Sequence, residues 1–276
     1  MCGRYVIYTA EELVDLRDIV EEAQRRADAA GEQAGSVQSG SAQALSGSAQ
    51  AHSSGAQLRL QFGSAQAQFD NVQAQPQPDN ATAPLFEQAS ILRVKTGEIF
   101  PTDIAPVLVS PAGASPDACV LEAQPMLWGF PQLGGRKGVI FNTRLEQAAE
   151  SSFWRDSLIR RRCVVPMSGF YEWQHGGPLD RQRYLFTREN ESLLYLAGIY
   201  QGAASAAPGD SPQSARTLEL LHHRFSIMTT TPNASISDVH NRMPVVLRPS
   251  ELEEWLFGDP QAFIDRNHIN LLRQAS

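Results

Sequence analysis

The sequence predicts a β-rich α+β fold, and three observations support that prediction. Short segments rich in β-branched and aromatic residues, separated by Gly and Pro, dominate the chain between about residues 104 and 247, a pattern typical of strands. A capped helix pattern stands near each end of the chain. One low-complexity stretch interrupts this order. Helices that flank a run of strands, rather than alternating with them, favour α+β over α/β.

The segments expected to form strands are each short, apolar and bounded by turn residues. With 276 residues, the chain is long enough to bury a substantial core between such strands. The expected strands are Ile104 to Val109, Gln124 to Phe130, Val139 to Thr143, Cys163 to Pro166, Leu193 to Tyr200, Phe225 to Thr230 and Pro244 to Leu247.

Two helices are expected outside the strand region. Thr9 followed by Glu12 matches a capping box, and the apolar residues that follow fall on one face of a helix running to about Arg26. The second helix begins at Ser250, has a Glu three residues later and ends at Gly258. We expect both helices to cover the strands.

The segment from about Ala27 to Pro84 consists mainly of Ala, Gln, Ser and Gly, and the tripeptide Ser-Ala-Gln recurs in it. It holds few large apolar residues, so it buries too little surface to offset the entropy lost on ordering. We therefore predict one domain over residues 1–276, interrupted by a disordered insertion at 27–84. Gln-rich tracts can self-associate, so an interaction role stays open beside a tolerated loop expansion.

The charge pattern excludes a strongly basic protein, because the formal net charge is −7. This argues against nonspecific binding of nucleic acid over the whole surface. Only Lys95 and Lys137 are lysines, which makes 21 of the 23 basic residues arginine. Arginine suits bidentate contact with phosphate. A compositional bias of the source genome accounts for the same excess equally well.

The cysteines indicate a reducing environment. Cys2, Cys119 and Cys163 are too few and too far apart for a disulfide framework or a zinc site. The N-terminal residues lack the pattern of a signal peptide, and no stretch has 18 consecutive apolar residues, so we expect a cytoplasmic protein without membrane contact. With no phosphate-cradling glycine loop, we predict neither a metal nor a cofactor.

Cys2 follows Met1 directly, so removal of the methionine would leave an α-amine and a thiol on one residue. The amine can attack an aldehyde to give an imine, and the sulfur then closes a five-membered thiazolidine ring. Both groups titrate near about pH 8 to 8.5, so each is partly nucleophilic at neutral pH. Taken alone, Cys2 fits a small buried residue better than a reactive one.

Glu172 is a carboxylate between two aromatic residues, directly after a buried-strand pattern. Burial there would raise its pKa and make it a proton donor or acceptor near neutral pH. The alternative is an exposed Glu at a strand end, paired with an arginine. The local sequence does not decide between the two.

Other polar residues stand inside core-like sequence. His240 and Arg242 fall on one face if that segment is extended, as do Asn142 and Arg144. His240 can move protons at neutral pH or cap a turn. Trp128, beside a glycine, can stack on a base or belong to the core. The remaining histidines lie in polar or low-complexity surroundings and are assigned no role: His52, His175, His222, His223 and His268.

Together these segments resemble the SRAP family, the SOS response-associated peptidases or abasic-site processing proteins. The motifs that carry the resemblance occur in the family's order along nearly the whole chain, apart from the insertion and the C-terminal tail. They are Met1-Cys2-Gly3-Arg4-Tyr5, Ala105-Pro106, Trp128 to Pro131, Asn142 to Glu146, Arg162 to Trp173, Ala197 to Tyr200 and Val239 to Pro244.

The resemblance implies a single SRAP-type domain with a barrel-like sheet core and flanking helices. It also implies a monomer that binds abasic sites in single-stranded DNA and forms a covalent thiazolidine link through Cys2. Glu172 would then assist proton transfers, His240 would help to open the deoxyribose ring, and Asn142 would position the site. Contacts with DNA would come from Arg4, Arg144, Arg242, Trp128 and Pro106.

Two other functions stay open at this point. In one, Cys2, His240 and Glu172 form a cysteine or N-terminal-nucleophile peptidase, in keeping with the family's older name. In the other, the chain only binds single-stranded DNA by stacking and arginine contacts. An associated lyase activity, a nucleoid location if the source is bacterial, and partners at replication forks are further implications of the resemblance.

Overall fold

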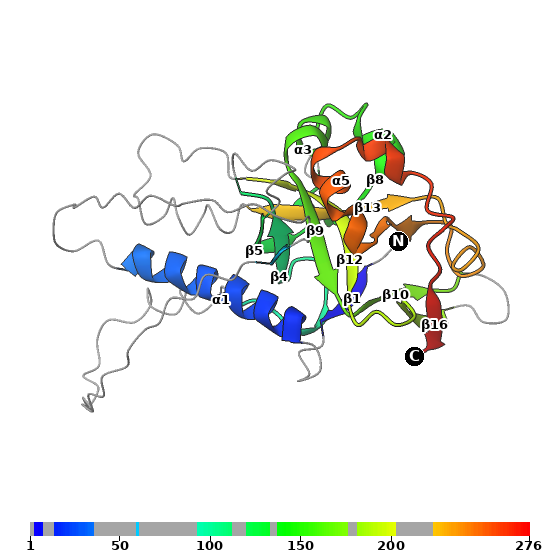
Figure 1. Cartoon of the computed structure of the whole chain (residues 1–276), viewed down its shortest axis with the longest axis horizontal. Coiled ribbons are helices and arrows are strands. Elements are labelled where there is room, and N and C mark those ends of the chain that lie inside the picture. The colour runs from blue at the N-terminus through cyan, green and yellow to red at the C-terminus, as the bar shows by residue number, and fades with distance from the viewer. Residues whose placement is uncertain are drawn as a thin grey trace.

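A computed structural model of the chain describes residues 3–7, 14–35, 59–60, 93–111, 120–132, 137–175, 181–202 and 223–276. In this part of the chain strands predominate, and two sheets pack against each other with helices around them (Figure 1). The predicted β-rich α+β class is confirmed.

The first sheet has five antiparallel strands in the described residues. Its order joins segments far apart in sequence, because the first strand of the chain lies between two strands from later parts. In spatial order the strands are β16 (Leu272–Ala275), β11 (Arg183–Thr187), β10 (Gly169–Trp173), β1 (Arg4–Ile7) and β3 (Gly97–Ile99).

The second sheet closes into a barrel. A path of neighbouring strands runs β13–β12–β9–β4–β5, and β13 also pairs in parallel with β5, which joins the two ends of the path. The barrel-like core implied by the family resemblance is therefore confirmed. The barrel strands are β4 (Ile104–Val109), β5 (Val120–Trp128), β9 (Arg162–Met167), β12 (Leu194–Gln201) and β13 (Arg224–Thr230).

Among the described residues, four short strands pair with strands of the barrel, and two others form a separate two-stranded sheet. One of them, β8, runs parallel to β13 with Asn142 opposite Ile227 and Arg144 opposite Thr229. The short strands are β2 (Arg59–Leu60), β6 (Phe130–Pro131), β7 (Val139–Ile140), β8 (Asn142–Arg144), β14 (Met243–Pro244) and β15 (Val246–Leu247).

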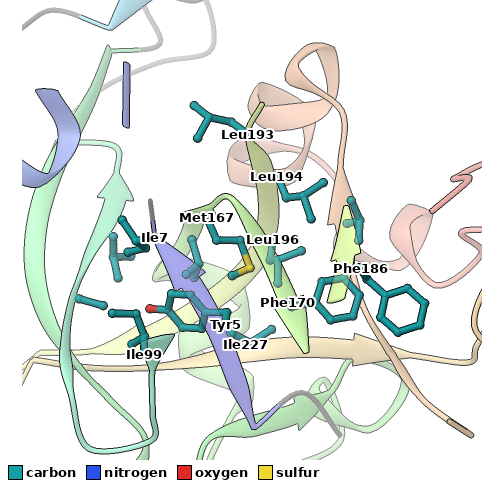
Figure 2. Packing of buried hydrophobic residues seen from close by; sticks show 14 of the residues in the cluster. Tyr5, Ile7, Ile99, Met167, Phe170, Phe186, Leu193, Leu194, Leu196 and Ile227 are labelled. Atoms are coloured by element: carbon teal, nitrogen blue, oxygen red, sulfur yellow. The ribbon is translucent and has the colours of Figure 1, made fainter. Parts of the chain in front are cut away.

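The inner face of the five-stranded sheet packs on the barrel. Figure 2 shows Tyr5, Ile99 and Phe170 of the five-stranded sheet close to Met167 and Leu196 of the barrel. All five side chains are fully buried. Removing a large apolar side chain from water contributes about 1.5 to 3 kcal/mol, so this layer holds β1 and β10 firmly against the barrel.

Helix α1 (Val14–Gly35) lies along β4 and β5 (Figure 1). Leu16, Ile19 and Ala23 are buried, and Arg26 bonds to Glu122 of β5 at 2.9 Å. The helix was expected to end near Arg26 and instead continues into the predicted insertion, whose first residues, rich in Ala, Glu and Gln, are good helix formers. Apart from the start of the insertion and strand β2, residues 27–84 lie outside the described residues.

The predicted C-terminal helix is present as a 3₁₀ turn η4 (Pro249–Glu251) followed by α5 (Leu252–Phe257). The prediction placed the cap of this helix at Ser250. In the structure, the Glu251 carboxylate instead accepts a hydrogen bond from the backbone N–H of Arg248 at 2.8 Å. Shorter helical segments are α2 (Leu145–Ala148), α3 (Arg155–Arg160) and η5 (Pro260–Phe263).

Every expected strand maps onto the barrel or its edge strands, and β4 has the predicted bounds. Two expected strands are each broken in two: Gly129, with φ of +108°, separates β5 from β6, and Phe141 separates β7 from β8. The five-stranded sheet was missed as a unit. None of the described helices has the length and apolar character needed to cross a membrane.

Candidate functional site

The start of the chain enters the five-stranded sheet beside Glu172. Arg4 of β1 is opposite Tyr171 of β10, and the strands are antiparallel. Continuing this register by one residue places Gly3 next to Glu172. The first described residue of the chain therefore lies beside Glu172. Cys2 itself lies outside the described residues.

The Glu172 side chain is buried, with 1% of its surface exposed. Burial raises the pKa of Glu172 to about 7, because the low-dielectric surroundings disfavour the carboxylate. The predicted buried carboxyl is thus confirmed, and the alternative of an exposed, arginine-paired Glu is excluded. A group with this pKa gives and accepts protons readily at neutral pH.

The position of β10 depends on close packing at Gly169. A Cβ atom there would lie 2.8 Å from the carbonyl oxygen of Phe186 on β11. Only a glycine lets the two strands approach so closely at this point. The strand carrying Glu172 is therefore fixed by its own first residue.

His240 lies in the loop that follows β13, and 9% of it is exposed. Its Nδ1 is 3.0 Å from the backbone N–H of Arg242, which donates to it, and 3.1 Å from the carbonyl oxygen of the same residue. With either tautomer, Nδ1 is committed to the backbone, so a ligand would have to use Nε2. Burial lowers the pKa of His240 to about 4, so the imidazole is neutral at neutral pH.

His175 was assigned no role from the sequence, yet its ring packs against His240. The ring centroids are 5.4 Å apart and the planes are inclined at 64°. Since His175 follows β10 three residues after Glu172, it connects the strand of the buried carboxyl to the loop of the neutral imidazole. Its exposed position at a strand end leaves no periodic pattern from which this contact could be predicted.

Arg242 is held by a carboxylate. Its two terminal nitrogens bond to the two oxygens of Glu146 at 2.9 and 2.8 Å, and one also donates to the carbonyl of Thr229 at 2.7 Å. His240 and Arg242 were expected to share one face of an extended segment. In the structure, the His240 ring accepts the backbone N–H of Arg242 and packs against His175, whereas the Arg242 side chain binds Glu146. The phosphate contact expected of Arg242 stays a prediction, and Glu146 occupies its guanidinium in this structure.

Strand β8 carries the next two predicted residues. Asn142 is half-buried and Arg144 is exposed, while Thr143 between them is buried, as the predicted alternation requires. Arg144 is opposite Thr229, the residue that binds Arg242. The structure thus links Asn142, Arg144, Arg242 and His240 around one end of the barrel. Their predicted roles in positioning and phosphate contact are not tested by this arrangement.

Trp128 and Pro106 are both buried in the free protein. Trp128 is fully buried, its ring lies 4.9 Å from that of Tyr5, and its indole N–H donates to the carbonyl of Phe141 at 2.9 Å. Pro106 is buried in β4 opposite Pro125. Trp128 belongs to the barrel core, and the expected contact of both residues with DNA stays a prediction.

Arg4 lies on the other face of the five-stranded sheet from Glu172. Side chains alternate along a strand, so Tyr5 and Glu172 face the barrel while Arg4 and Trp173 face outward. The Arg4 guanidinium lies 4.4 Å from the centre of the Phe100 ring and 5.2 Å from that of Trp173. Trp173 is half-buried and offers part of its aromatic ring to solvent, whereas from the sequence it was only part of a motif.

Among the described residues, no group of three or more His, Cys, Asp or Glu side chains is arranged to hold a metal ion. What the site does offer is a carboxyl poised to titrate near neutral pH, a neutral imidazole and arginines, gathered where the chain begins. Such a set suits proton transfer to and from a reacting group beside an anionic ligand.

Comparison with known proteins identifies the family to which this chain belongs. The sequence pattern of the family described as SOS response associated peptidase (SRAP) matches residues 1–275. The chain belongs to the SRAP family. The resemblance drawn from the sequence motifs is therefore confirmed.

Individual SRAP relatives match over part of this chain. The abasic site processing protein YoqW of Bacillus subtilis is 31% identical over 117 residues, which cover 42% of this chain and 47% of that protein. The abasic site processing protein YedK of Escherichia coli is 26% identical over 136 residues, covering 49% of this chain and 55% of that protein. The matched region thus spans about half the length of these relatives.

A solved structure, from Bacteroides thetaiotaomicron, covers 68% of this chain and 81% of its own with a TM-score of 0.49 and 22% identity. A second, from Bordetella bronchiseptica, covers 65% of this chain and 87% of its own, also with a TM-score of 0.49, at 18% identity.

Proposed function

We propose that this protein binds abasic sites in single-stranded DNA and becomes covalently linked to them through Cys2. SRAP relatives of this chain in Bacillus subtilis and Escherichia coli are named abasic site processing proteins. The observation that carries the proposal is the buried Glu172, with its pKa raised to about 7, next to the point where the chain enters the sheet.

The reaction would begin once hydrolysis of the Met1–Cys2 bond has freed the Cys2 amine. An abasic sugar is mostly a closed hemiacetal, so its hydroxyl must lose a proton and its ring oxygen must gain one before an aldehyde exists. The Nε2 of His240 is the atom we assign to this exchange. Because the His240 imidazole is neutral at neutral pH, it adds no positive charge to the site.

The amine would then add to the aldehyde carbon to give a carbinolamine. Glu172 donates a proton to the departing hydroxyl, so water leaves and an imine forms. The Cys2 sulfur adds to the imine carbon, and its proton passes through Glu172 to the nitrogen, closing the thiazolidine. The balance is one water released per link. Holding both nucleophiles on one residue makes ring closure intramolecular.

The decisive test is the intact mass of the purified protein after mixing with a single-stranded oligonucleotide that contains one abasic site. We expect a species equal to the protein without Met1, plus the oligonucleotide, minus one water. An undamaged oligonucleotide of the same length is the control and should give no adduct.

Cys2→Ala keeps the amine and loses the sulfur. It should give only a labile imine, which becomes permanent on borohydride reduction. A heat-stable adduct from this variant without reduction would contradict the thiazolidine.

A peptidase would use the same residues differently. In that mechanism His240 would take the thiol proton from Cys2. Cleavage of an added peptide that thiol alkylation abolishes would favour the peptidase. Salt-sensitive DNA binding without any covalent species would favour a simple binding module.

The monomeric state, lyase activity, fork partners and nucleoid location expected from the resemblance stay predictions.

A further inference from the structure

The outward face of the five-stranded sheet carries two arginines joined by one carboxylate. Glu98 of β3 bonds to Arg4 of β1 through one oxygen, at 2.9 Å, and to Arg183 of β11 through the other, at 3.0 Å. The three side chains come from three different strands. Each is about a quarter to a third exposed, with 26% for Arg4, 28% for Arg183 and 35% for Glu98. A ligand from solvent can therefore reach them.

Aromatic rings hold both guanidinium groups in place. Arg4 lies over Phe100 and Trp173, and Arg183 lies 4.6 Å from the ring centre of Tyr171. The strand register allows this, because Arg183 is opposite Trp173 and Arg4 is opposite Tyr171, so each arginine lies diagonally across from the β10 ring on which it stacks. A guanidinium stacked on a ring loses little further freedom when it binds an anion. The two donors are thus pre-organised around a single anion position.

A carboxylate that gives one oxygen to each of two arginines stands where a phosphate group would stand, since phosphate offers the same paired oxygens. Two arginines against one glutamate leave a positive charge at this point of the sheet. Arg4 is also only two residues from Cys2, so an anion bound here lies near the start of the chain.

We propose that Glu98 occupies the position of a DNA backbone phosphate in the free protein, and that Arg4 and Arg183 bind this phosphate when single-stranded DNA displaces the carboxylate. Arg183 is then a DNA-binding residue, and Glu98 is an internal competitor that weakens binding to undamaged strands. This inference rests on the proposed function, because it takes single-stranded DNA as the ligand.

The test is equilibrium binding of a fluorescent oligothymidylate without abasic sites, measured by anisotropy over a range of salt concentrations with the full chain. Glu98→Gln keeps the shape and removes the charge, so it should tighten binding about two- to five-fold, as expected for an exposed charge pair. Arg183→Gln should weaken binding by a similar factor. It should also reduce the slope of log affinity against log salt by about 0.7, one phosphate contact on a single strand.

Matched controls come from the ion pair between Arg188 and Glu191, at 2.7 Å just beyond the end of β11. Glu191→Gln and Arg188→Gln change the net charge by the same amounts without touching the Glu98 bridge. If Glu98→Gln and Glu191→Gln tighten binding equally, or Arg183→Gln and Arg188→Gln weaken it equally, the proposal is wrong. Should Glu98→Gln fail to fold, the two arginine variants alone decide the matter.

The failure of this inference is distinguishable from failure of the proposed function. An adduct with abasic DNA, together with equal effects of the two glutamate variants, would overturn the Glu98 bridge alone. The expected effects on undamaged DNA without any adduct would overturn the covalent chemistry alone.

Discussion

Two glutamates at the same end of the molecule behave in opposite ways. Glu172 is buried on the inner face of the five-stranded sheet, and its pKa is raised to about 7. Glu146 lies in the first turn of helix α2 and is paired with both terminal nitrogens of Arg242. Burial opposes ionisation here, but that pairing, with the hydroxyl of Thr230, holds the pKa of Glu146 below its usual range. The residue type is identical, and the environment sets the charge at neutral pH.

The difference shows how the fold separates chemistry from structure. Glu146 stays ionised and fastens the His240 loop to β8 through Arg242. Glu172 lies in buried surroundings where it exchanges a proton near neutral pH. The carboxyl that we propose to react is thus held by packing, while the carboxyl that holds a loop is paired with an arginine.

The sharpest way to break this comparison is to remove the acid–base group of Glu172 without changing its shape. Glu172→Gln cannot donate or accept a proton, so the rate of adduct formation at pH 7 should fall about 10²-fold or more. Single-turnover adduct formation on an abasic oligonucleotide, quenched at intervals, measures this rate. Glu191→Gln is the control and should react at the wild-type rate. Equal rates for Glu172→Gln and wild type would remove Glu172 from the chemistry.

A second test compares stability at two pH values. The pKa of Glu172 is higher in the folded protein, so between about pH 4.5 and 7 the folded state binds more protons than the unfolded state, and stability falls as pH rises. A pKa raised from 4.5 to about 7 corresponds to about 3 kcal/mol. Glu172→Gln lacks this penalty, so its free energy of unfolding relative to wild type should increase by about that amount from pH 4.5 to pH 8.

Glu146→Gln should show the opposite dependence of stability on pH. Urea unfolding at the two pH values measures the free energy of unfolding of both variants. Its lowered pKa means that the ion pair with Arg242 stabilises the folded state above the unfolded pKa and is lost as pH falls. The variant should therefore be less stable than wild type at pH 8, with the gap narrowing toward acid pH. A pH-independent difference for both variants would show that the two carboxyls do not titrate as described.

The smallest effect is expected at Arg144, which is exposed on β8 beside this pair. Arg144→Gln should leave the melting temperature unchanged, because surface substitutions rarely exceed about 0.5 kcal/mol. If the residue contacts phosphate, the variant should bind undamaged single-stranded DNA a few-fold more weakly, with a salt slope smaller by about 0.7. An unchanged slope would exclude Arg144 from the DNA contact.

The barrel was predictable from sequence and the five-stranded sheet was not. Barrel strands such as β4 are long, apolar runs between turn residues, which the hydrophobic pattern reveals. The missed sheet includes the three-residue β3 and the exposed β16, whose sequence Leu-Arg-Gln-Ala has no strand pattern. Backbone pairing with distant segments, rather than local composition, makes these residues strands.

The same distinction applies to the site. The buried carboxyl of Glu172 was one of two predicted alternatives, because an acid between aromatics directly after an apolar strand either follows that strand into the core or stands exposed at its end. For Trp128 the sequence left two alternatives open, because its pattern fits a core strand as well as a stacking surface, and the structure has it buried. The contact of His175 with His240 and the Glu98 bridge join segments distant in sequence, and single residues at strand ends carry no periodicity that would predict them.

The pairing of β1 with β10 also has a consequence for how the protein is made. A ribosome adds about 5 to 20 residues per second, so Trp173 emerges on the order of ten seconds after Arg4. During that interval the nascent chain exposes its first residues without the strand that will flank them. The removal of Met1 that the proposed function requires would therefore have its opportunity before β10 pairs with β1.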